Sequence, residues 1–319
     1  MEKFLITGGQ GFIGAWMARQ LLDEGTAFVL FDRQPDDHIL AQVIEPHEIG
    51  ELERVFGDVA DPRQVEEAVA SAGATHLVHL AGLQVPTCRE DPVLGARVNV
   101  IGTLNVFEAA RRHADRLRGV VYASSAAVAG PTEDYAGPID DDTHHVPRTH
   151  YGVFKTANEG SARVYWLDHG VPSVGLRPLA VYGVGREIGI SSGPTKAIRA
   201  VVLGEEYTIP FSGTTGFNYA GDVAAVFVAS ARALREGAHA LNHPGEIHTV
   251  EEFLRCVEEV VPGARGKLRS EGDPLPVAHD FDEPGLRRLL GEVPHTPIRE
   301  GIRATAERFR VLRERGQIP

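Results

Sequence analysis

Tyr151 and Lys155 are four residues apart, a spacing that suggests chemistry. On a helix, residues i and i+4 lie on the same face, so the phenol and the ammonium would be neighbours. A neighbouring cation stabilises a phenolate, the form that a general base acting on an alcohol requires. With 7 tyrosines and 4 lysines in 319 residues, such a pair arises by chance with a probability of about 0.09. An ordinary surface helix pair is the alternative.

Two adjacent serines, Ser124 and Ser125, follow an apolar run, and Ser125 lies 26 residues before Tyr151. In a parallel sheet, the end of such a strand lies at the edge where ligands bind. One of the two hydroxyls is therefore a candidate for orienting a substrate oxygen. A plain Ser-Ser loop is the alternative.

A glycine-rich turn lies near the N-terminus, between an expected strand and an expected helix. Gly9-Gln-Gly11-Phe12-Ile13-Gly14 fits G-x-G-x-x-G, and Gly8 adds a second register. Small residues there let the backbone approach a pyrophosphate at the positive end of a helix. An ordinary Gly-rich turn is the alternative for this motif alone.

Acidic residues follow the next two expected strands. Asp32 lies 18 residues beyond Gly14, where a carboxylate accepts hydrogen bonds from the adenosine ribose and repels a 2′-phosphate. The predicted cofactor is therefore NAD rather than NADP, although Arg33 would partly offset the repulsion. Asp58 and Val59 are expected to flank the adenine.

Short apolar runs alternate with helical patterns through the first half of the chain. This alternation predicts an α/β fold with a doubly wound parallel sheet of the Rossmann type and a smaller, irregular C-terminal substrate lobe. Residues 1–178 would form the dinucleotide-binding domain, with 213–245 returning to it, and 179–212 and 246–319 the substrate lobe. The expected strands are 4–7, 28–31, 75–80, 119–125 and 173–177; the expected helices are 12–24, 62–72, 92–113, 150–169, 195–204, 222–234 (capped by Asp222) and 298–315.

Composition excludes several classes of function. The net charge of −12 opposes binding to nucleic acid. No run reaches the roughly 18 apolar residues of a membrane span, and the N-terminus lacks the pattern of a signal peptide. Two cysteines, Cys88 and Cys256, favour buried thiols in a reducing compartment, so we expect a cytoplasmic protein. No metal site is predicted, and His144-His145 reads as a solvated loop pair.

Together these motifs resemble the extended short-chain dehydrogenase/reductase family, also called the NAD-dependent epimerase/dehydratase family. The resemblance covers nearly the whole chain. It rests on Thr7 to Gly14, Asp32, Gly57 to Val59, His79 to Gly82, Asn99 to Asn105, Ser124-Ser125, Tyr151 to Lys155 and Arg177-Pro178.

The resemblance assigns roles to several residues. It implies that Ser125, Tyr151 and Lys155 are catalytic and that Tyr151 and Lys155 also contact the cofactor, Lys155 at the nicotinamide ribose. It further implies a homodimer formed through the helices near 92–113 and 150–169. The remaining implied cofactor contacts are Leu80, Ala81 and Gly82 near the phosphates and ribose, Asn99 behind them, and Pro178 beside the nicotinamide.

Three departures from the family pattern concern the substrate. The motif that usually ends Val-Tyr-Gly reads Val128-Ala129-Gly130 here. Ala180 replaces an Asn that usually holds a nucleotide diphosphate, and Thr215 stands where an Arg often pairs with the phosphates. These departures argue against a nucleotide-diphosphate sugar, unless Arg186, Lys196 or Arg199 compensates.

The predicted function is an NAD-dependent oxidoreductase that acts on a secondary hydroxyl of a small sugar, sugar acid or polyol. Gln84 and Arg186 are the candidate substrate contacts beside Ser125, although Arg186 could equally pair with a surface carboxylate. The first alternative is an NAD-dependent nucleotide-sugar epimerase, which returns the hydride to a transient ketone. The second is a non-catalytic dinucleotide sensor, against which the intact Ser125, Tyr151 and Lys155 argue.

Overall fold

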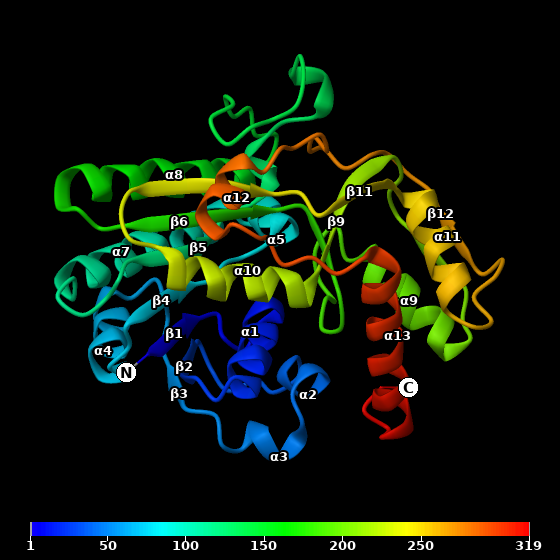
Figure 1. The fold of residues 1–319 in the computed structure, drawn as a ribbon, viewed down its shortest axis with the longest axis horizontal. Helices are drawn as coiled ribbons and strands as arrows, with labels where there is room; N and C mark the ends of the chain where they lie inside the picture. Colours follow the sequence, from blue (N-terminus) through cyan, green and yellow to red (C-terminus); the bar gives the residue numbers. More distant parts are fainter. Residues whose placement is uncertain (1, 319) are drawn as a thin grey trace.

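A seven-stranded parallel sheet forms the centre of the computed structural model, which describes residues 2–318 (Figure 1). The sheet winds in both directions from β1, as the alternating sequence pattern predicts. Its strands read as continuous apolar runs because both faces are covered by helices. In spatial order they are β10 (Ala238–His243), β6 (Ser173–Pro178), β5 (Val120–Ala123), β4 (His76–His79), β1 (Lys3–Thr7), β2 (Ala27–Asp32) and β3 (Arg54–Phe56).

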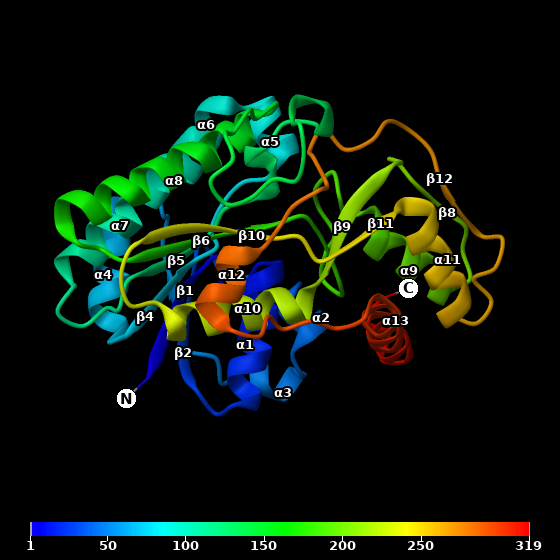
Figure 2. The ribbon, with the colours of Figure 1, turned by 45° about the horizontal axis from the view of Figure 1, so that its top comes forward.

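Two helical layers enclose this sheet, and each buries a separate apolar cluster against it (Figure 2). The first layer is built on α1 and α10, and the second on α4, α7 and α8. The first layer contains α1 (Phe12–Asp23), α2 (Leu40–Val43), α3 (Pro46–Ile49), α10 (Ala220–Ala233) and α12 (Pro284–Leu290); the second contains α4 (Pro62–Ala72), α5 (Val85–Glu90), α6 (Pro92–Ala96), the π-helical η1 (Arg97–Ile101), α7 (Gly102–Arg112) and α8 (His150–His169).

Helix α8 carries Tyr151 and Lys155, and local signals define both of its ends. The Thr149 hydroxyl accepts a hydrogen bond from the Gly152 amide and caps the N-terminus. Gly170 ends the helix with a φ of 63°, a left-handed conformation that glycine adopts without steric cost. The first turn of α8, which contains Tyr151, is therefore held firmly.

A smaller lobe lies beyond the carboxyl ends of β6 and β10 (Figure 1). Its own apolar core is formed by three helices and two small sheets. The elements are β7 (Ala180–Tyr182), β9 (Thr214–Tyr219) and β11 (Glu246–Thr249) in one sheet, β8 (Tyr207–Ile209) and β12 (Leu268–Ser270) in the other, and α9 (Gly193–Leu203), α11 (Val250–Val260) and α13 (Ile298–Glu314); two short 3₁₀ turns, η2 (Ala126–Val128) and η3 (Thr132–Asp134), precede α8.

One local prediction is wrong, and another is confirmed with a change of detail. Asp222 does not cap α10, because the helix begins at Ala220 and Tyr219 is its N-cap residue. The Asp222 carboxylate instead accepts hydrogen bonds from the amide and the hydroxyl of Thr296, both at 2.7 Å. The helix expected over 92–113 is interrupted by the π-helical turn η1. A π-turn inside a helix often marks a functional site, and η1 contains Asn99.

Candidate active site

The turn between β1 and α1 places a helix N-terminus against the loop that follows β4. Gly8 has a φ of 67°, and a Cβ there would lie 2.6 Å from the Ala81 amide nitrogen. A Cβ on Gly14 would lie 2.6 Å from the Gly8 carbonyl oxygen. Glycine is therefore required at both positions. The close approach leaves the first amides of α1 facing a cavity, an arrangement suited to an anion.

This cavity, of about 490 Å³, extends from the glycine turn to the end of β2. The Asp32 carboxylate at that end accepts hydrogen bonds from the amides of Gln10, at 3.1 Å, and Arg33, at 2.8 Å. Asp32 therefore also fixes the glycine turn. The predicted cofactor residues that line this cavity are Gly8, Gly11, Phe12, Ile13, Gly14, Asp32, Asp58, Val59, Leu80, Ala81 and Gly82, whereas Pro178 lines the adjoining cavity described below.

A buried polar chain supports the cavity from behind. The His79 ring contacts the Thr7 hydroxyl at 2.7 Å through Nδ1 and the Thr103 hydroxyl at 3.0 Å through Nε2. Thr103 donates to the Asn99 carbonyl, so we assign the ring proton to Nε2. Burial, reinforced by the charge of Lys155, lowers the pKa of His79 to about 3. The ring is therefore neutral at ordinary pH and joins β1, β4 and α7.

Asn99 lies behind the loop that follows β4. Its side-chain amide accepts from the Leu83 amide at 2.7 Å and donates to the Leu83 carbonyl at 2.8 Å, as a neighbouring strand would. The Asn99 carbonyl, within the π-helical turn, accepts hydrogen bonds from the side chains of Asn158 and Thr103. Asn99 therefore positions Leu83 but does not itself line either of the two cavities described.

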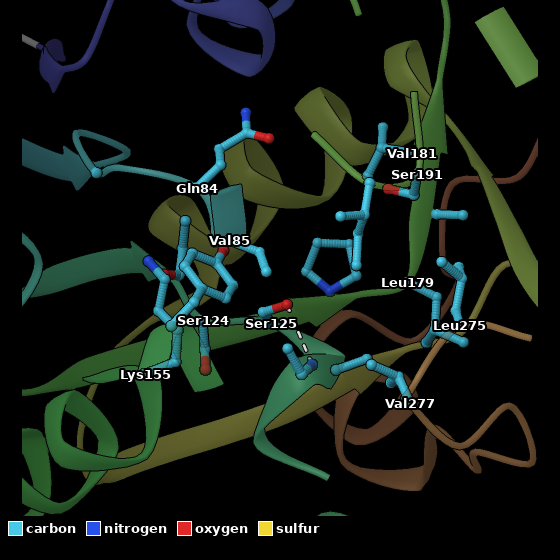
Figure 3. Close-up of a pocket in the computed structure, with 18 of the residues that line it drawn as sticks. Gln84, Val85, Ser124, Ser125, Lys155, Leu179, Val181, Ser191, Leu275 and Val277 are labelled. Carbon is cyan, nitrogen blue, oxygen red and sulfur yellow. Dashed lines mark hydrogen bonds between the residues drawn. The ribbon is translucent and has the colours of Figure 1, made fainter. Parts of the chain in front are cut away.

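A second, smaller cavity of about 190 Å³ adjoins the first, and Ser125, Tyr151 and Lys155 all line it (Figure 3). The Ser125 hydroxyl oxygen accepts from the Ala127 amide at 3.2 Å, which leaves its proton free to donate. The Lys155 ammonium lies 5.4 Å from the centre of the Tyr151 ring and donates to the Ala123 carbonyl at 2.5 Å. Tertiary structure thus brings the three predicted catalytic side chains together.

Glu159, one helical turn beyond Lys155, is a residue of the site that sequence reasoning missed. The Ser124 hydroxyl donates to its carboxylate at 2.5 Å, so Ser124 and Ser125 have different roles. The Glu159 carboxylate also receives two hydrogen bonds, both of 2.8 Å, from the guanidinium of Arg177 on β6. The spacing of Tyr151, Lys155 and Glu159 at i, i+4 and i+8 was the signal that could have found it.

The environment of Glu159 corrects the expectation for His145. His145 is not a solvated loop residue, because its Nδ1 lies 3.6 Å from the Glu159 carboxylate and its side chain is 17% exposed. Burial, assisted by the charge of Arg177, lowers the pKa of His145. The loop before α8 therefore packs on the buried ion pair.

Gln84 and Arg186, the predicted substrate contacts, lie together at the junction of the two cavities. With the Gln84 amide oriented to satisfy both of its groups, it accepts from Arg186 at 3.1 Å and donates to the Ile188 carbonyl at 3.1 Å. Arg186 also donates to the Ser191 hydroxyl at 3.2 Å, but its Nε is buried without a partner. Burial lowers the pKa of Arg186, so an anion beside it would be stabilising.

The two substituted positions of the family pattern line the smaller cavity. Ala180 is 2% exposed and Thr215 is 6% exposed, and neither side chain carries a charge. Of the three cations that could compensate, Arg186 lines this cavity, whereas Lys196 and Arg199 are not among its lining residues. The departures therefore lie in the site itself.

Comparisons with known proteins agree with this geometry. A model of the NAD dependent epimerase/dehydratase family matches residues 4–243. The chain belongs to this family. The resemblance, the fold and the cofactor predicted from the sequence are thereby confirmed, and the protein is an NAD-dependent enzyme of the extended short-chain dehydrogenase/reductase type.

The relatives differ in the reactions that their names describe. UDP-glucuronic acid decarboxylase 1 of Xenopus tropicalis is 27% identical, over 97% of this chain and 72% of that protein. The 3 beta-hydroxysteroid dehydrogenase type 7 of Homo sapiens is 33% identical, over 74% of this chain and 64% of that protein. The solved UDP-glucose 4-epimerase of Thermus thermophilus, in complex with NAD, is 28% identical with a TM-score of 0.79, covering 97% of this chain and 99% of that one.

The residues present fit NAD. The α1 amides behind Gly11 suit the pyrophosphate, and the Asp32 carboxylate lies at the other end of the same cavity, where it suits the adenosine ribose. The smaller cavity with Ser125 and Tyr151 begins where the larger one ends, at Leu80, Gly82 and Ala123.

Cofactor preference is expected to depend on Asp32. Asp32→Ala should weaken NAD binding by about tenfold or more, since it removes the charge-assisted ribose contacts and a support of the glycine turn. It should bring the dissociation constants of NAD and NADP closer together, as measured by fluorescence titration of both nucleotides. Asp115→Ala removes an exposed acid that lines neither cavity and should leave the NAD/NADP ratio unchanged within about a factor of two. Tighter binding of NADP by the unmodified protein would contradict the assignment.

Proposed function

We propose that the protein is an NAD-dependent dehydrogenase of a secondary hydroxyl on a small sugar, sugar acid or polyol. The observation that carries this proposal is the pairing of Ser125, Tyr151 and Lys155 with a cavity of only about 190 Å³. Sites for drug-sized ligands are typically about 300–1,000 Å³. A small alcohol suits this space better than a nucleotide sugar.

The chain's own residues would divide the chemistry among them. The Ser125 proton, free of internal partners, donates to the substrate oxygen and orients it. Tyr151, as phenolate, accepts the hydroxyl proton while the carbinol C–H bond breaks. Lys155 stabilises that phenolate and holds the nicotinamide ribose. Bound NAD supplies the hydride acceptor, and the products are a ketone and NADH.

Arg186 and Gln84 would hold an anionic or hydroxyl-bearing group of the substrate. Arg186 has a buried Nε without a partner and two further nitrogens already directed by Gln84 and Ser191. Among the described residues no carboxylate pairs with Arg186, so a substrate carboxylate at the junction of the cavities would gain a charge-assisted hydrogen bond from its guanidinium.

Tyr151→Phe removes the proton acceptor but keeps the ring. Turnover should fall by about 10² to 10⁴, the usual range for acid-base catalysis, with little change in NAD affinity. Lys155→Met should lower turnover and weaken NAD binding together, because Lys155 is proposed to contact the ribose as well. Both effects are measurable by NADH absorbance and NAD titration.

Tyr165→Phe is the matched control. Tyr165 lies on the same helix and its hydroxyl donates to Glu108 at 2.9 Å, outside both cavities. Its turnover should stay within about twofold of the parent, because no group of the site is altered. Near-normal turnover of Tyr151→Phe would mean that the site is misplaced.

A nucleotide-sugar epimerase is the second candidate, favoured by the names of several relatives. It would use the same three catalytic residues and return the hydride to the ketone. Retention of NAD through many turnovers, without net formation of NADH, would favour this candidate.

Binding of nucleotide sugars separates the two candidates. Ala180 and Thr215 leave a diphosphate without two expected partners, each typically contributing about 1.5–3 kcal/mol. UDP, UDP-glucose and UDP-glucuronate should therefore bind to this protein at least about a hundredfold more weakly than to a site that keeps both phosphate partners. Calorimetry with saturating NAD measures this directly, and NAD binding in the same sample shows that the protein is active. Micromolar binding of any of the three would restore epimerisation as the leading function.

We also propose a homodimer through α8 and the α6–α7 segment. Val153, Val164 and Leu167 are 48%, 50% and 71% exposed and repeat along one stripe of α8. Val93 and Ile101, on the neighbouring helical segment, are 80% and 46% exposed. Large apolar side chains exposed along one helical face are typical of interaction surfaces.

Analytical ultracentrifugation tests the dimer. Leu167→Glu should produce monomers, because it would bury an unpaired charge in the interface. Ile247→Glu, at an exposed apolar position on β11 of the smaller lobe, should leave the dimer intact. A monomeric parent protein would disprove the proposal.

We propose a cytoplasmic location because of the state of the two cysteines. Cys88 and Cys256 are both free and buried, as expected for thiols in a reducing compartment. No helix within residues 2–318 has the length and apolar character needed to cross a bilayer.

A further inference from the structure

The smaller cavity has two chemically different ends. Gln84 and Ser191, with Arg186 between them, form a polar end, whereas Leu275 and Val277 lie on the opposite side of Ser125 (Figure 3). Leu179 also lines the cavity and packs on the same buried cluster as Val277, which adds it to this apolar end. The side chains of Leu179, Leu275 and Val277 offer no hydrogen-bond donor or acceptor.

The loop that carries Leu275 and Val277 is fixed by backbone hydrogen bonds. The Val277 amide donates to the Leu275 carbonyl at 2.8 Å, across the intervening Pro276. The next residue, Ala278, donates to the Gly130 carbonyl at 2.8 Å. At the other end of the loop, the Ser212 amide donates to the Asp273 carbonyl at 3.3 Å. The two apolar side chains are therefore held in place on both sides.

Leu179 is held just as closely. Its amide donates to the Asn218 side chain at 3.1 Å, and a Cβ on Gly216 would lie 3.2 Å from its Cδ2 atom. Leu179 and Val277 also pack against a buried cluster that includes Ile139 and Phe281. These contacts leave the apolar end little freedom to rearrange around a polar group.

A substrate hydroxyl placed against these three side chains would find no hydrogen-bond partner among them, so its loss of water there is unfavourable. A methyl or methylene group there would gain by leaving water. The polar end holds the Arg186 guanidinium and therefore has the opposite preference, because it favours an anion.

We propose that the substrate is a small hydroxy acid of the carbohydrate type whose far end lacks a hydroxyl. Its carboxylate would contact Arg186 and Gln84, its reacting secondary hydroxyl would lie between Ser125 and Tyr151, and a terminal methyl group would pack on Leu179, Leu275 and Val277. This inference rests on the proposed dehydrogenase function. In this proposal the apolar end decides whether the enzyme prefers a substrate with a terminal methyl group or one with a terminal hydroxyl.

Matched pairs of substrates test the inference. Aldonic acids of four to six carbons are each compared with the analogue whose terminal CH₂OH is CH₃, with the same configuration elsewhere. NADH formation gives kcat/KM for each member. For the pair with the highest activity, the deoxy acid should be preferred by about 10- to 100-fold, the usual discrimination of a hydrophobic pocket against an added or missing group.

Val277→Thr should lower this preference by about tenfold, since it adds a hydroxyl at the apolar end with little change of shape. Val293→Thr makes the same change at a partly buried position outside the cavity and should leave the preference unchanged. The ratio within a pair is independent of the fraction of folded protein, so partial unfolding of a variant does not affect the result.

The outcomes separate this inference from the function on which it rests. If NADH forms and depends on Tyr151, but the hydroxylated acids are used as well as the deoxy acids or better, the apolar-end inference is wrong and the dehydrogenase stands. The same conclusion follows if Val277→Thr leaves the ratio unchanged. If no acid of either series yields NADH, the proposed function fails for hydroxy acids and the inference fails with it.

Discussion

The buried ion pair between Glu159 and Arg177 is the interaction on which the geometry of the site depends. Their side chains are only 8% and 3% exposed, and removing one partner of such a pair typically costs about 3–5 kcal/mol. Through Ser124, the pair fixes the end of β5 against α8. The preceding Ala123 carbonyl is held by Lys155 and the next residue, Ser125, faces the cavity. Helix α8 thus holds the two residues that precede Ser125, and the catalytic arrangement is coupled to stability.

A second constraint operates where the sheet reverses direction, between β1 and β4. The loops that leave these strands approach so closely at Gly8 and Ala81 that no side chain fits between them. Polar groups trapped behind the loops need internal partners, and the neutral ring of His79 provides two contacts there. The π-turn at Asn99 provides the rest by supporting Leu83. The dinucleotide cavity is therefore shaped by a rigid, hydrogen-bonded support.

The substrate end is built differently, from loops of the smaller lobe. Segments near 130–139, 179 and 275–281 are distant in the sequence and meet through a few backbone hydrogen bonds and a small apolar cluster. Loops of this kind vary without disturbing the scaffold. This division accounts for relatives that share the fold and the cofactor chemistry while their names describe sugar-nucleotide and steroid reactions.

Local patterns in the sequence determined the sheet, the glycine turn, Asp32 and the Tyr151–Lys155 pair, because helical and strand periodicity and i, i+4 spacing are encoded within short windows. Tertiary structure alone decided features that depend on partners distant in the sequence. Asp222 bonds Thr296 instead of capping its own helix, His145 packs on Glu159, and Asn99, within a π-helical turn, hydrogen-bonds Leu83. The apolar end of the substrate cavity belongs to the same class, since Leu179 and Val277, almost a hundred residues apart in the sequence, pack on one buried cluster only in the folded chain. A buried polar group or a cavity wall is specified by the residues that reach it in space, and a single sequence does not contain those distances.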